Sequence, residues 1–303
     1  MSKKMRGNLM LLLTALIWGT AFVAQSAGMD HVQPFTYNGI RTLIGGLVLI
    51  PVILFFDRIK PAEQRLSAEE QKSVTRNSVI GGVFCGLFLF VASSFQQFGI
   101  SMTTAGKAGF ITALYIVIVP LLGVFIKKKI PGIIWLCVAI AVAGFYLLCV
   151  NEGFSVSMGD LLVLCCAFFF SLHIMAIDHF GAKNVDGVRM SCVQFLVAGS
   201  LCIICMFLFE EPTMANIWAA KGSILYAGVM SCGVAYTLQI LGQKHTDPTT
   251  ATLLMSLESV FAVLAGWALL NESLSFKELA GCVLVFIAVI LAQIPLPVKA
   301  KKN

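Results

Sequence analysis

The sequence of 303 residues consists mainly of apolar runs that are separated by short polar segments. A helix needs about 20 apolar residues to cross the roughly 30 Å of hydrocarbon in a bilayer, where each unpaired backbone group costs several kcal/mol. Runs of this length predict transmembrane helices, because the strands of membrane barrels are alternating segments of about ten residues. The runs expected to cross the membrane are residues 9–28, 35–56, 78–100, 104–126, 132–150, 159–177, 188–209, 218–241, 248–270 and 276–294.

Composition supports this prediction and narrows the classes of function. Hydrophobic residues make up 58% of the chain and charged residues 12%, whereas soluble domains average roughly 45–50% and about 25%. The lipid bilayer is therefore the expected environment, and the spans leave no room for a soluble domain. All ten cysteines lie in apolar runs, and the CxxC motif of Cys202 and Cys205 has no His or Asp nearby. Packing is their expected role, so no metal, cofactor or catalytic residue is predicted.

The distribution of charge predicts the orientation of the chain. The formal net charge of +6 does not indicate nucleic acid binding, because lysines and arginines gather in the cytoplasmic loops of membrane proteins. With the N-terminus inside, the outer segments carry only Lys107, Lys221 and Lys277, and Arg41 lies within a span. Both termini are thus predicted to be cytoplasmic, in a multi-pass protein of the cell inner (plasma) membrane. The first run resembles a signal peptide but exceeds the roughly 7–15 apolar residues of one, so a retained first helix is expected.

Local motifs mark helix starts and close helix contacts. The spacing of a capping box occurs at Ser67–Glu70, Ser157–Asp160 and Ser275–Glu278. Gly82 and Gly86 form a GxxxG motif, which favours close approach of another helix. Pro120 lacks a backbone N–H in the middle of its span and predicts a kink there.

Residues 114–148 and 254–292 read alike, because each runs from one apolar span through a short polar turn into the next. This similarity predicts two repeats, residues 1–150 and residues 151–303, with five spans each and a short C-terminal tail. Since five is odd, the second repeat would enter the membrane inverted. Inverted repeats are typical of secondary transporters, which bind their solute near the midplane between the repeats.

Several short blocks resemble a known family. They are Ile17–Thr20, Gly39–Leu43, Ala105–Phe110, Tyr236–Gln239, Ser256–Ser259 and Leu270–Leu274 followed by Gly281. Over nearly its whole length the sequence resembles the EamA family of ten-helix carriers, within the drug/metabolite transporter superfamily. Two positions depart from the family pattern: Ser259 stands where a proline is usual, and Lys127–Lys129 replace an acidic turn. The resemblance implies that the substrate is an amino acid or a similar metabolite, more often exported than taken up.

Ionisable side chains inside the spans need an explanation, because a charge at mid-membrane costs about 2.5–3.5 kcal/mol on insertion scales. Glu258 lies about ten residues, or roughly 15 Å, from the inner end of its span, too deep for its side chain to reach the interface. It is expected to face a hydrated cavity and exchange a proton or, alternatively, to lock helices together. Arg41 either binds the polar part of a solute or extends to the outer interface. His173 either packs in the core or assists Glu258 in carrying a proton.

Polar side chains at helical spacing predict where the cavity lies. Stripes of hydroxyl and amide groups on several helices favour a shared hydrated cavity, although single groups also serve as contacts between helices. The predicted solute-binding residues are Trp18, Tyr37, Asn38, Arg41, Gln96, Gln97, Tyr115, Gln194, Tyr236 and Gln239, and the predicted proton carriers are Glu258 and His173.

These observations predict an all-α membrane protein of ten transmembrane helices, arranged as two inverted five-helix repeats. It would be a secondary active transporter that exports a small polar metabolite by alternating access, driven by protons. Uptake is the nearest alternative. A membrane-embedded enzyme or a sensor is a further alternative, but no HExxH, GxSxG or P-loop motif occurs. The expected partners are a small-molecule substrate and the lipid bilayer, without nucleic acid, and a homodimer stays open.

Overall fold

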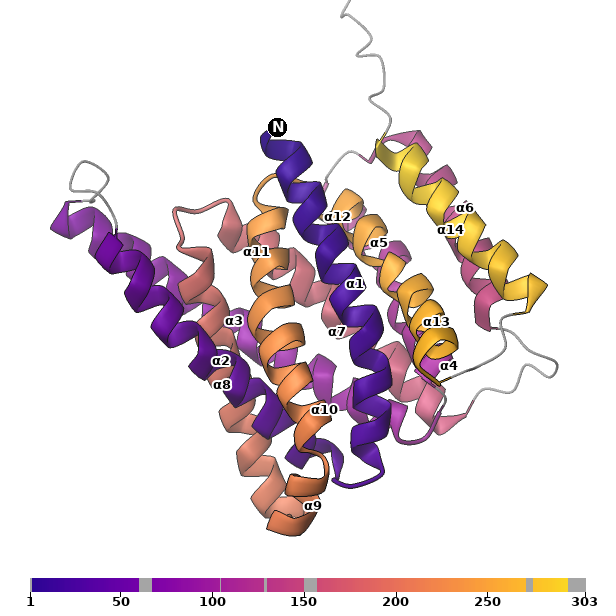
Figure 1. The fold of residues 1–303 in the computed structure, drawn as a ribbon. Coiled ribbons are helices and arrows are strands. Elements are labelled where there is room, and N and C mark those ends of the chain that lie inside the picture. Colours follow the sequence, from indigo (N-terminus) through magenta and orange to yellow (C-terminus); the bar gives the residue numbers. More distant parts are fainter. Residues whose placement is uncertain are drawn as a thin grey trace, which may run out of the picture.

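The computed structural model describes residues 2–59, 67–103, 105–127, 130–149, 157–270 and 275–293. Every regular element in these ranges is a helix (Figure 1). The elements are α1 (Lys3–Met29), α2 (Pro34–Ile59), α3 (Ala68–Ile100), α4 (Ala105–Thr112), α5 (Tyr115–Phe125), α6 (Gly132–Cys149), α7 (Met158–Gly181), α8 (Gly187–Phe209), α9 (Met214–Ala219), α10 (Lys221–Tyr226), the π-helix η2 (Ala227–Tyr236), α11 (Thr237–Gln243), α12 (Pro248–Met255), α13 (Leu257–Leu270) and α14 (Phe276–Gln293).

The described helices coincide with the predicted apolar runs. Within the described residues, seven helical stretches are long and apolar enough to cross a membrane: Lys3–Met29, Pro34–Ile59, Ala68–Ile100, Met158–Gly181, Gly187–Phe209, Lys221–Gln243 and Pro248–Ala265. The shorter apolar helices Tyr115–Phe125, Gly132–Gly144 and Leu279–Leu291 lie in the remaining predicted runs. An all-helical, multi-pass membrane protein is thereby confirmed.

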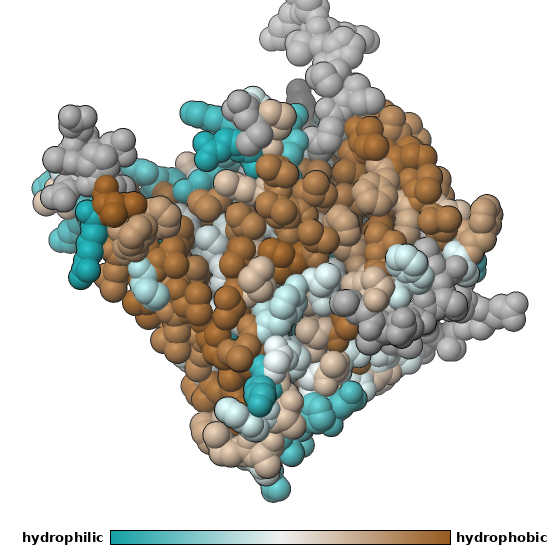
Figure 2. Space-filling view, in the orientation of Figure 1, coloured by the Kyte–Doolittle hydropathy of each residue, from teal (hydrophilic) through white to brown (hydrophobic). Residues whose placement is uncertain are grey.

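The outer surface of the helix bundle is apolar. Phe125 is 83% exposed, Phe207 72% and Phe276 86%. Figure 2 shows hydrophobic side chains over much of one face, with hydrophilic groups gathered near its upper and lower ends. Apolar surface is favoured in hydrocarbon over water by roughly 25 cal/mol per Å², so the bilayer stabilises this exposed surface.

Two of the predicted capping boxes are confirmed. Ser67 Oγ accepts from the Glu70 backbone N at 3.3 Å, and Glu70 Oε2 accepts from the Ser67 backbone N at 3.0 Å. Ser157 and Asp160 form the same pair of bonds at 3.2 and 2.9 Å. Glu70 and Asp160 therefore belong to the capping boxes at the N-termini of α3 and α7. The side chains of Glu278 and Lys107 lie outside the described part of the chain, as do residues 128, 129 and 271–274.

Glycines allow α8 to pack closely against α3 and α2. A Cβ at Gly82 would lie 2.6 Å from Val193 Cβ, and one at Gly86 would lie 2.8 Å from the Gln194 backbone oxygen. The GxxxG motif of α3 therefore makes the close approach that its sequence predicts.

The packing of α2 on α8 is reciprocal. A Cβ at Gly46 would lie 3.1 Å from Leu196 Cδ2, and one at Gly199 would lie 2.8 Å from Leu43 Cδ2. Each helix thus contributes a glycine and the leucine three residues before it, Leu43 and Gly46 on α2 and Leu196 and Gly199 on α8. The glycine of each helix contacts the leucine of the other. The two helices therefore use the same pair of residue types in this contact.

Carboxylates join α2 and α8 at both ends in the same reciprocal way. Glu210, just after α8, accepts from the backbone N of Phe35 and of Thr36 at 2.7 Å each, at the start of α2. At the opposite end, Asp57 near the end of α2 forms an ion pair with Arg189 in the first turn of α8. Each carboxylate thus lies at the C-terminal end of one helix and binds the N-terminal end of the other.

Further helix pairs repeat the pattern. Between α11 and α1, a Cβ at Gly242 would lie 3.0 Å from the Gly7 backbone oxygen, and between α3 and α7 a Cβ at Gly99 would lie 3.0 Å from the Gly159 oxygen. Helices α6 and α14 form a pair at one side of the bundle (Figure 1), where a Cβ at Gly144 would lie 2.8 Å from the Gly281 oxygen. Several glycine contacts between residues 1–150 and residues 151–303 therefore have a counterpart when the two halves are exchanged.

Two spans are interrupted near their middle. One consists of α4, which ends at Thr112, and α5, which begins at Tyr115; the other consists of α12 and α13, which meet at Ser256. The first break lies before Pro120, the residue at which the sequence predicts a kink, and α5 continues through that proline. The π-helix η2 occupies the middle of the span from Lys221 to Gln243, and π-helical turns are frequent at functional sites.

Candidate functional site

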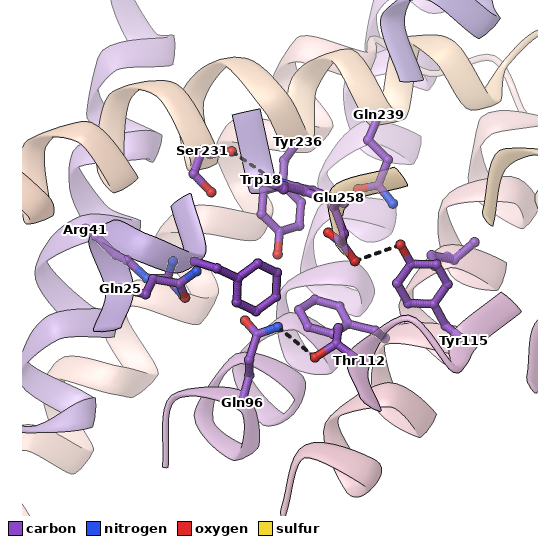
Figure 3. Close-up of a pocket in the computed structure, with 13 residues that line it drawn as sticks. Trp18, Gln25, Arg41, Gln96, Thr112, Tyr115, Ser231, Tyr236, Gln239 and Glu258 are labelled. Atoms are coloured by element: carbon purple, nitrogen blue, oxygen red, sulfur yellow. Dashed lines mark hydrogen bonds between the residues drawn. The ribbon is translucent and has the colours of Figure 1, made fainter. Parts of the chain in front are cut away.

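A small cavity lies between the helices, beside the two breaks (Figure 3). It is lined by Trp18, Phe22, Gln25, Arg41, Gln96, Thr112, Tyr115, Phe170, Ile174, Ser231, Tyr236, Gln239 and Glu258. The centres of water-sized molecules can occupy about 30 Å³ of it, which is room for roughly two waters at about 10–15 Å³ each. Side chains or helices must therefore move before a metabolite fits.

Arg41 supplies a buried positive charge to this cavity. Its side chain is held by a hydrogen bond from Nε to Asn38 Oδ1 at 2.9 Å, and its guanidinium carbon lies 5.4 Å from the centre of the Tyr37 ring. Asn38 in turn donates to the Ser93 backbone oxygen at 2.9 Å. The residue is 5% exposed, so its side chain does not extend to the interface. Among the described residues, no carboxylate forms an ion pair with Arg41, which leaves the terminal guanidinium nitrogens for an anionic group in the cavity.

Glu258 supplies the acidic group of the cavity. It is 3% exposed and lies in the first turn of α13, where the positive end of the helix dipole favours a carboxylate. Tyr115 Oη donates to Glu258 Oε1 at 2.8 Å. Within the described part of the chain, no lysine or arginine pairs with Glu258. In Figure 3, Arg41 and Glu258 lie on different sides of Tyr236.

Amide side chains add neutral polar groups to the lining. Gln96 Nε2 donates to Thr112 Oγ1 at 3.3 Å. Gln25 Oε1 and Gln239 Oε1 are buried without a hydrogen-bond partner among the described residues. A buried acceptor without a donor costs roughly 1–3 kcal/mol, so water or a solute that donates to these oxygens is favoured in the cavity.

Aromatic side chains form an apolar wall beside the polar groups. The ring centres of Trp18 and Tyr236 lie 4.6 Å apart, and Trp18 Nε1 donates to the Ser231 backbone oxygen at 3.4 Å. Phe22 and Phe170 complete this wall. The cavity thus combines one positive charge, one carboxyl group, free amide oxygens and aromatic rings, a combination suited to a small solute that is polar at one end.

The structure divides the predicted site residues into two groups. Those that line the cavity are Trp18, Arg41, Gln96, Tyr115, Tyr236, Gln239 and Glu258, and those outside the lining are Tyr37, Asn38, Gln97, His173 and Gln194. Tyr37 and Asn38 hold Arg41 in place rather than face the cavity. Sequence reasoning missed Phe22, Gln25, Thr112, Phe170, Ile174 and Ser231. Of these, Gln25 carried a signal, because it is an amide within an apolar run.

His173 and Gln194 form a separate buried pair. The ring Nε2 of His173 lies 3.0 Å from Gln194 Oε1, and both residues are 0% exposed. The remaining polar atoms, His173 Nδ1 and Gln194 Nε2, have no hydrogen-bond partner among the described residues. Neither residue lines the cavity that contains Glu258, although the centre of the His173 ring lies 6.0 Å from the centre of the Tyr236 ring, which does.

A multi-pass helical bundle with a narrow polar cavity at its broken helices is the architecture of a membrane transporter. The profile of the EamA-like transporter family matches residues 5–150 and 157–293, so the chain belongs to this family. It is 29% identical over 301 residues to an uncharacterized transporter of Archaeoglobus fulgidus, an alignment that covers 96% of this chain and 87% of the relative. It is 22% identical over 284 residues to the uncharacterized transporter YoaV of Bacillus subtilis, with 91% and 92% covered.

A solved crystal structure has the same fold. It matches with a TM-score of 0.72 at 21% sequence identity and covers 95% of this chain and 96% of the other. The likeness extends over nearly the whole chain, so the same arrangement of helices occurs in a solved protein structure.

Proposed function

We propose that the protein is a secondary active transporter that moves a small polar metabolite, such as an amino acid, across the cell inner membrane by alternating access. The observation that carries this proposal is that Arg41 and Glu258 line the same cavity. Among the described residues, Arg41 has no carboxylate partner. Arg41 binds the anionic group of the solute, Glu258 carries a proton or meets a cationic group, and the aromatic wall holds an apolar part.

The ten spans form two inverted repeats, residues 1–150 and 151–303, that move relative to each other. Reciprocal contacts support this arrangement: Gly46 with Leu196 and Gly199 with Leu43 between α2 and α8. The two family matches, over residues 5–150 and 157–293, support the same division. With five spans in each repeat, both termini lie on the same side of the membrane, and the distribution of lysine and arginine favours the cytoplasmic side.

Alternating access requires that this conformation be closed toward one side. All eight residues of α12 are buried, and the helix packs against α1, α5 and α14. With the N-terminus inside, α12 occupies the inner half of its span and blocks the route from the cavity to the cytoplasm. The direction of net transport is export, with the proton gradient as the driving force, and Glu258 is the site that exchanges the proton. His173 takes part only in a conformation that opens its pair with Gln194.

Purified protein in liposomes tests the proposal. A panel of labelled amino acids is supplied with and without a pH gradient, and wild type is compared with Glu258→Gln and with empty liposomes. Wild type is expected to accelerate flux of at least one solute when a pH gradient is imposed, and Glu258→Gln is expected to fold but to lose the response to the gradient. Full gradient-driven flux in Glu258→Gln would exclude proton coupling through this residue, and net flux with the opposite sign would indicate uptake.

A further inference from the structure

The two broken spans lie against each other half by half. The first half of one, α4, packs against the second half of the other, α13, and α5 packs against α12. Ser259 of α13 donates to the Gly109 backbone oxygen of α4 at 3.0 Å, a bond within the α4–α13 pair. The four segments therefore form two units, the α4–α13 pair and the α5–α12 pair, with both helix breaks at the junction between them.

Neither break contains a glycine or a proline. At the first, Leu114 N donates to Ile111 O at 3.1 Å and Ile116 N to Ala113 O at 3.0 Å, three residues back in place of four. At the second, Ser259 N donates to Ser256 O at 3.2 Å in the same way. Since local sequence does not impose these breaks, contacts with neighbouring helices maintain them.

One side-chain hydrogen bond joins the two pairs among the described residues of these four segments. It runs from Tyr115 Oη, at the start of α5, to Glu258 Oε1, in the first turn of α13. The α13 end is fixed against α1, where a Cβ at Gly19 would lie 2.7 Å from the Glu258 backbone oxygen and 2.5 Å from Phe261 Cβ. The bond from Tyr115 therefore ties the α5–α12 pair to a carboxylate whose helix turn is held by α1.

We propose that Tyr115 is a positioning residue that couples the occupancy of the Glu258 carboxylate to the bending of the two broken spans. While the carboxylate accepts from Tyr115, the α5–α12 pair is held to the α4–α13 pair. A proton or a cationic group on Glu258 takes away the charge-assisted bond and releases the α5–α12 pair. This inference rests on the proposed role of Glu258 in transport, but it makes a prediction about the helix breaks that does not require a known substrate.

Few groups near Glu258 other than its own carboxyl could change charge with pH and so alter the helix breaks. The titratable or charged groups that face Glu258 from the surrounding helices are Tyr115 on α5, Tyr236 on η2, Cys166 on α7 and, across the cavity, Arg41 on α2. The aromatic hydroxyls, the thiol and the guanidinium have ordinary pKa values above about 8. On acidification below pH 8, Glu258 is therefore the group in this set whose charge changes, since the ordinary pKa of a glutamate is about 4.3.

Hydrogen exchange of the full chain in nanodiscs, read by mass spectrometry, tests the coupling without a transport assay. The readout is exchange of the backbone amides in residues 112–118 and 252–258, corrected for the intrinsic effect of pH, in wild type, Tyr115→Phe, Glu258→Gln and the control Ser259→Ala. In Tyr115→Phe, the amides at both breaks are expected to exchange about tenfold faster. This factor corresponds to about 1.5 kcal/mol, the lower end of the range for a hydrogen bond to a charged group. Glu258→Gln keeps a neutral bond and is expected to show about a threefold increase, since charge-assisted bonds are roughly twice as strong.

The pH dependence separates coupling from a purely structural role. Wild type and Ser259→Ala are expected to exchange faster at both breaks at pH 4 than at pH 8, because carboxyl groups of glutamate ordinarily bind a proton at about pH 4.3. Tyr115→Phe is expected to lose this difference. Equal pH dependence in Tyr115→Phe and wild type would overturn the proposal, as would unchanged exchange in both Tyr115→Phe and Glu258→Gln. If liposomes show no transport of any solute while the exchange results hold, the proposed function fails and the coupling between the breaks stands.

Discussion

The bundle contains two buried polar clusters that differ in their surroundings. Arg41 and Glu258 lie in a cavity beside the helix breaks, whereas His173 and Gln194 contact each other inside continuous helices. Both clusters are almost completely buried. Burial and polarity therefore do not distinguish the proposed solute site from a packing contact. The helix breaks and the unoccupied space beside the polar groups do distinguish them.

The largest effect is expected when the charge of the first cluster is removed. Arg41→Ala deletes the group proposed to bind the anionic part of the solute, and hydrogen bonds to charged groups contribute about 1.5–3 kcal/mol, or roughly 10–100-fold in affinity. Arg41→Lys keeps the charge without the planar fork and should retain part of the flux. The measurement is the concentration of solute at half-maximal flux in liposomes. An Arg41→Ala protein that folds and transports like wild type would remove Arg41 from the solute site.

A second expected effect concerns the wall that holds Glu258. In Gly19→Ala, the new Cβ would lie 2.7 Å from the Glu258 backbone oxygen and 2.9 Å from the Ala262 backbone N. Overpacking of this kind costs up to about 3 kcal/mol, and it would displace the first turn of α13. The matched control is Gly109→Ala, whose nearest neighbour would be Ser259 Oγ at 3.9 Å. Thermal unfolding in detergent should show a lower midpoint for Gly19→Ala alone; equal midpoints would mean that α1 and α13 adjust freely.

The second cluster is expected to affect stability more than transport. Gln194→Leu leaves His173 Nε2 without its partner at a cost of about 1–3 kcal/mol, whereas the double variant His173→Phe/Gln194→Leu removes both polar groups and should recover most of it. The midpoint of thermal unfolding measures both effects. The response of flux to a pH gradient should persist in the double variant, and its loss would place His173 in the path of the proton.

The sequence predicted the spans and the helix starts because both depend on local properties. The length of each apolar run predicted a span, and the capping boxes at Ser67 and Ser157 could be predicted because their hydrogen-bond partners lie only three residues away. The helix breaks at Ala113–Leu114 and at Ser256 could not be predicted, because no glycine or proline marks them; Pro120, which drew attention to this span, lies within α5. Their position depends on contacts between distant segments, such as Tyr115 with Glu258.

The candidate site was predictable in its charged residues but not in its extent. Glu258 and Arg41 stood out because a charge inside hydrocarbon is costly. His173 and Gln194 are buried and polar like the cavity residues, and nothing in the sequence indicated that they would contact each other. Gln25 was missed because it has no polar neighbour at helical spacing in α1 that would have placed it in a stripe.

The smallest effect is expected at a site remote from both clusters, which supplies the baseline for the other variants. Ser67→Ala removes the hydroxyl that accepts from Glu70 N at the exposed start of α3, and loss of such a cap costs about 1 kcal/mol. The frayed turn lies near the membrane surface, far along α3 from Gln96, so the unfolding midpoint should fall slightly while flux and its pH response stay at wild-type values. A clear loss of flux in Ser67→Ala would show that transport responds to small changes in stability anywhere in the bundle, and the variants of Arg41 and Glu258 would then have to be compared at equal stability.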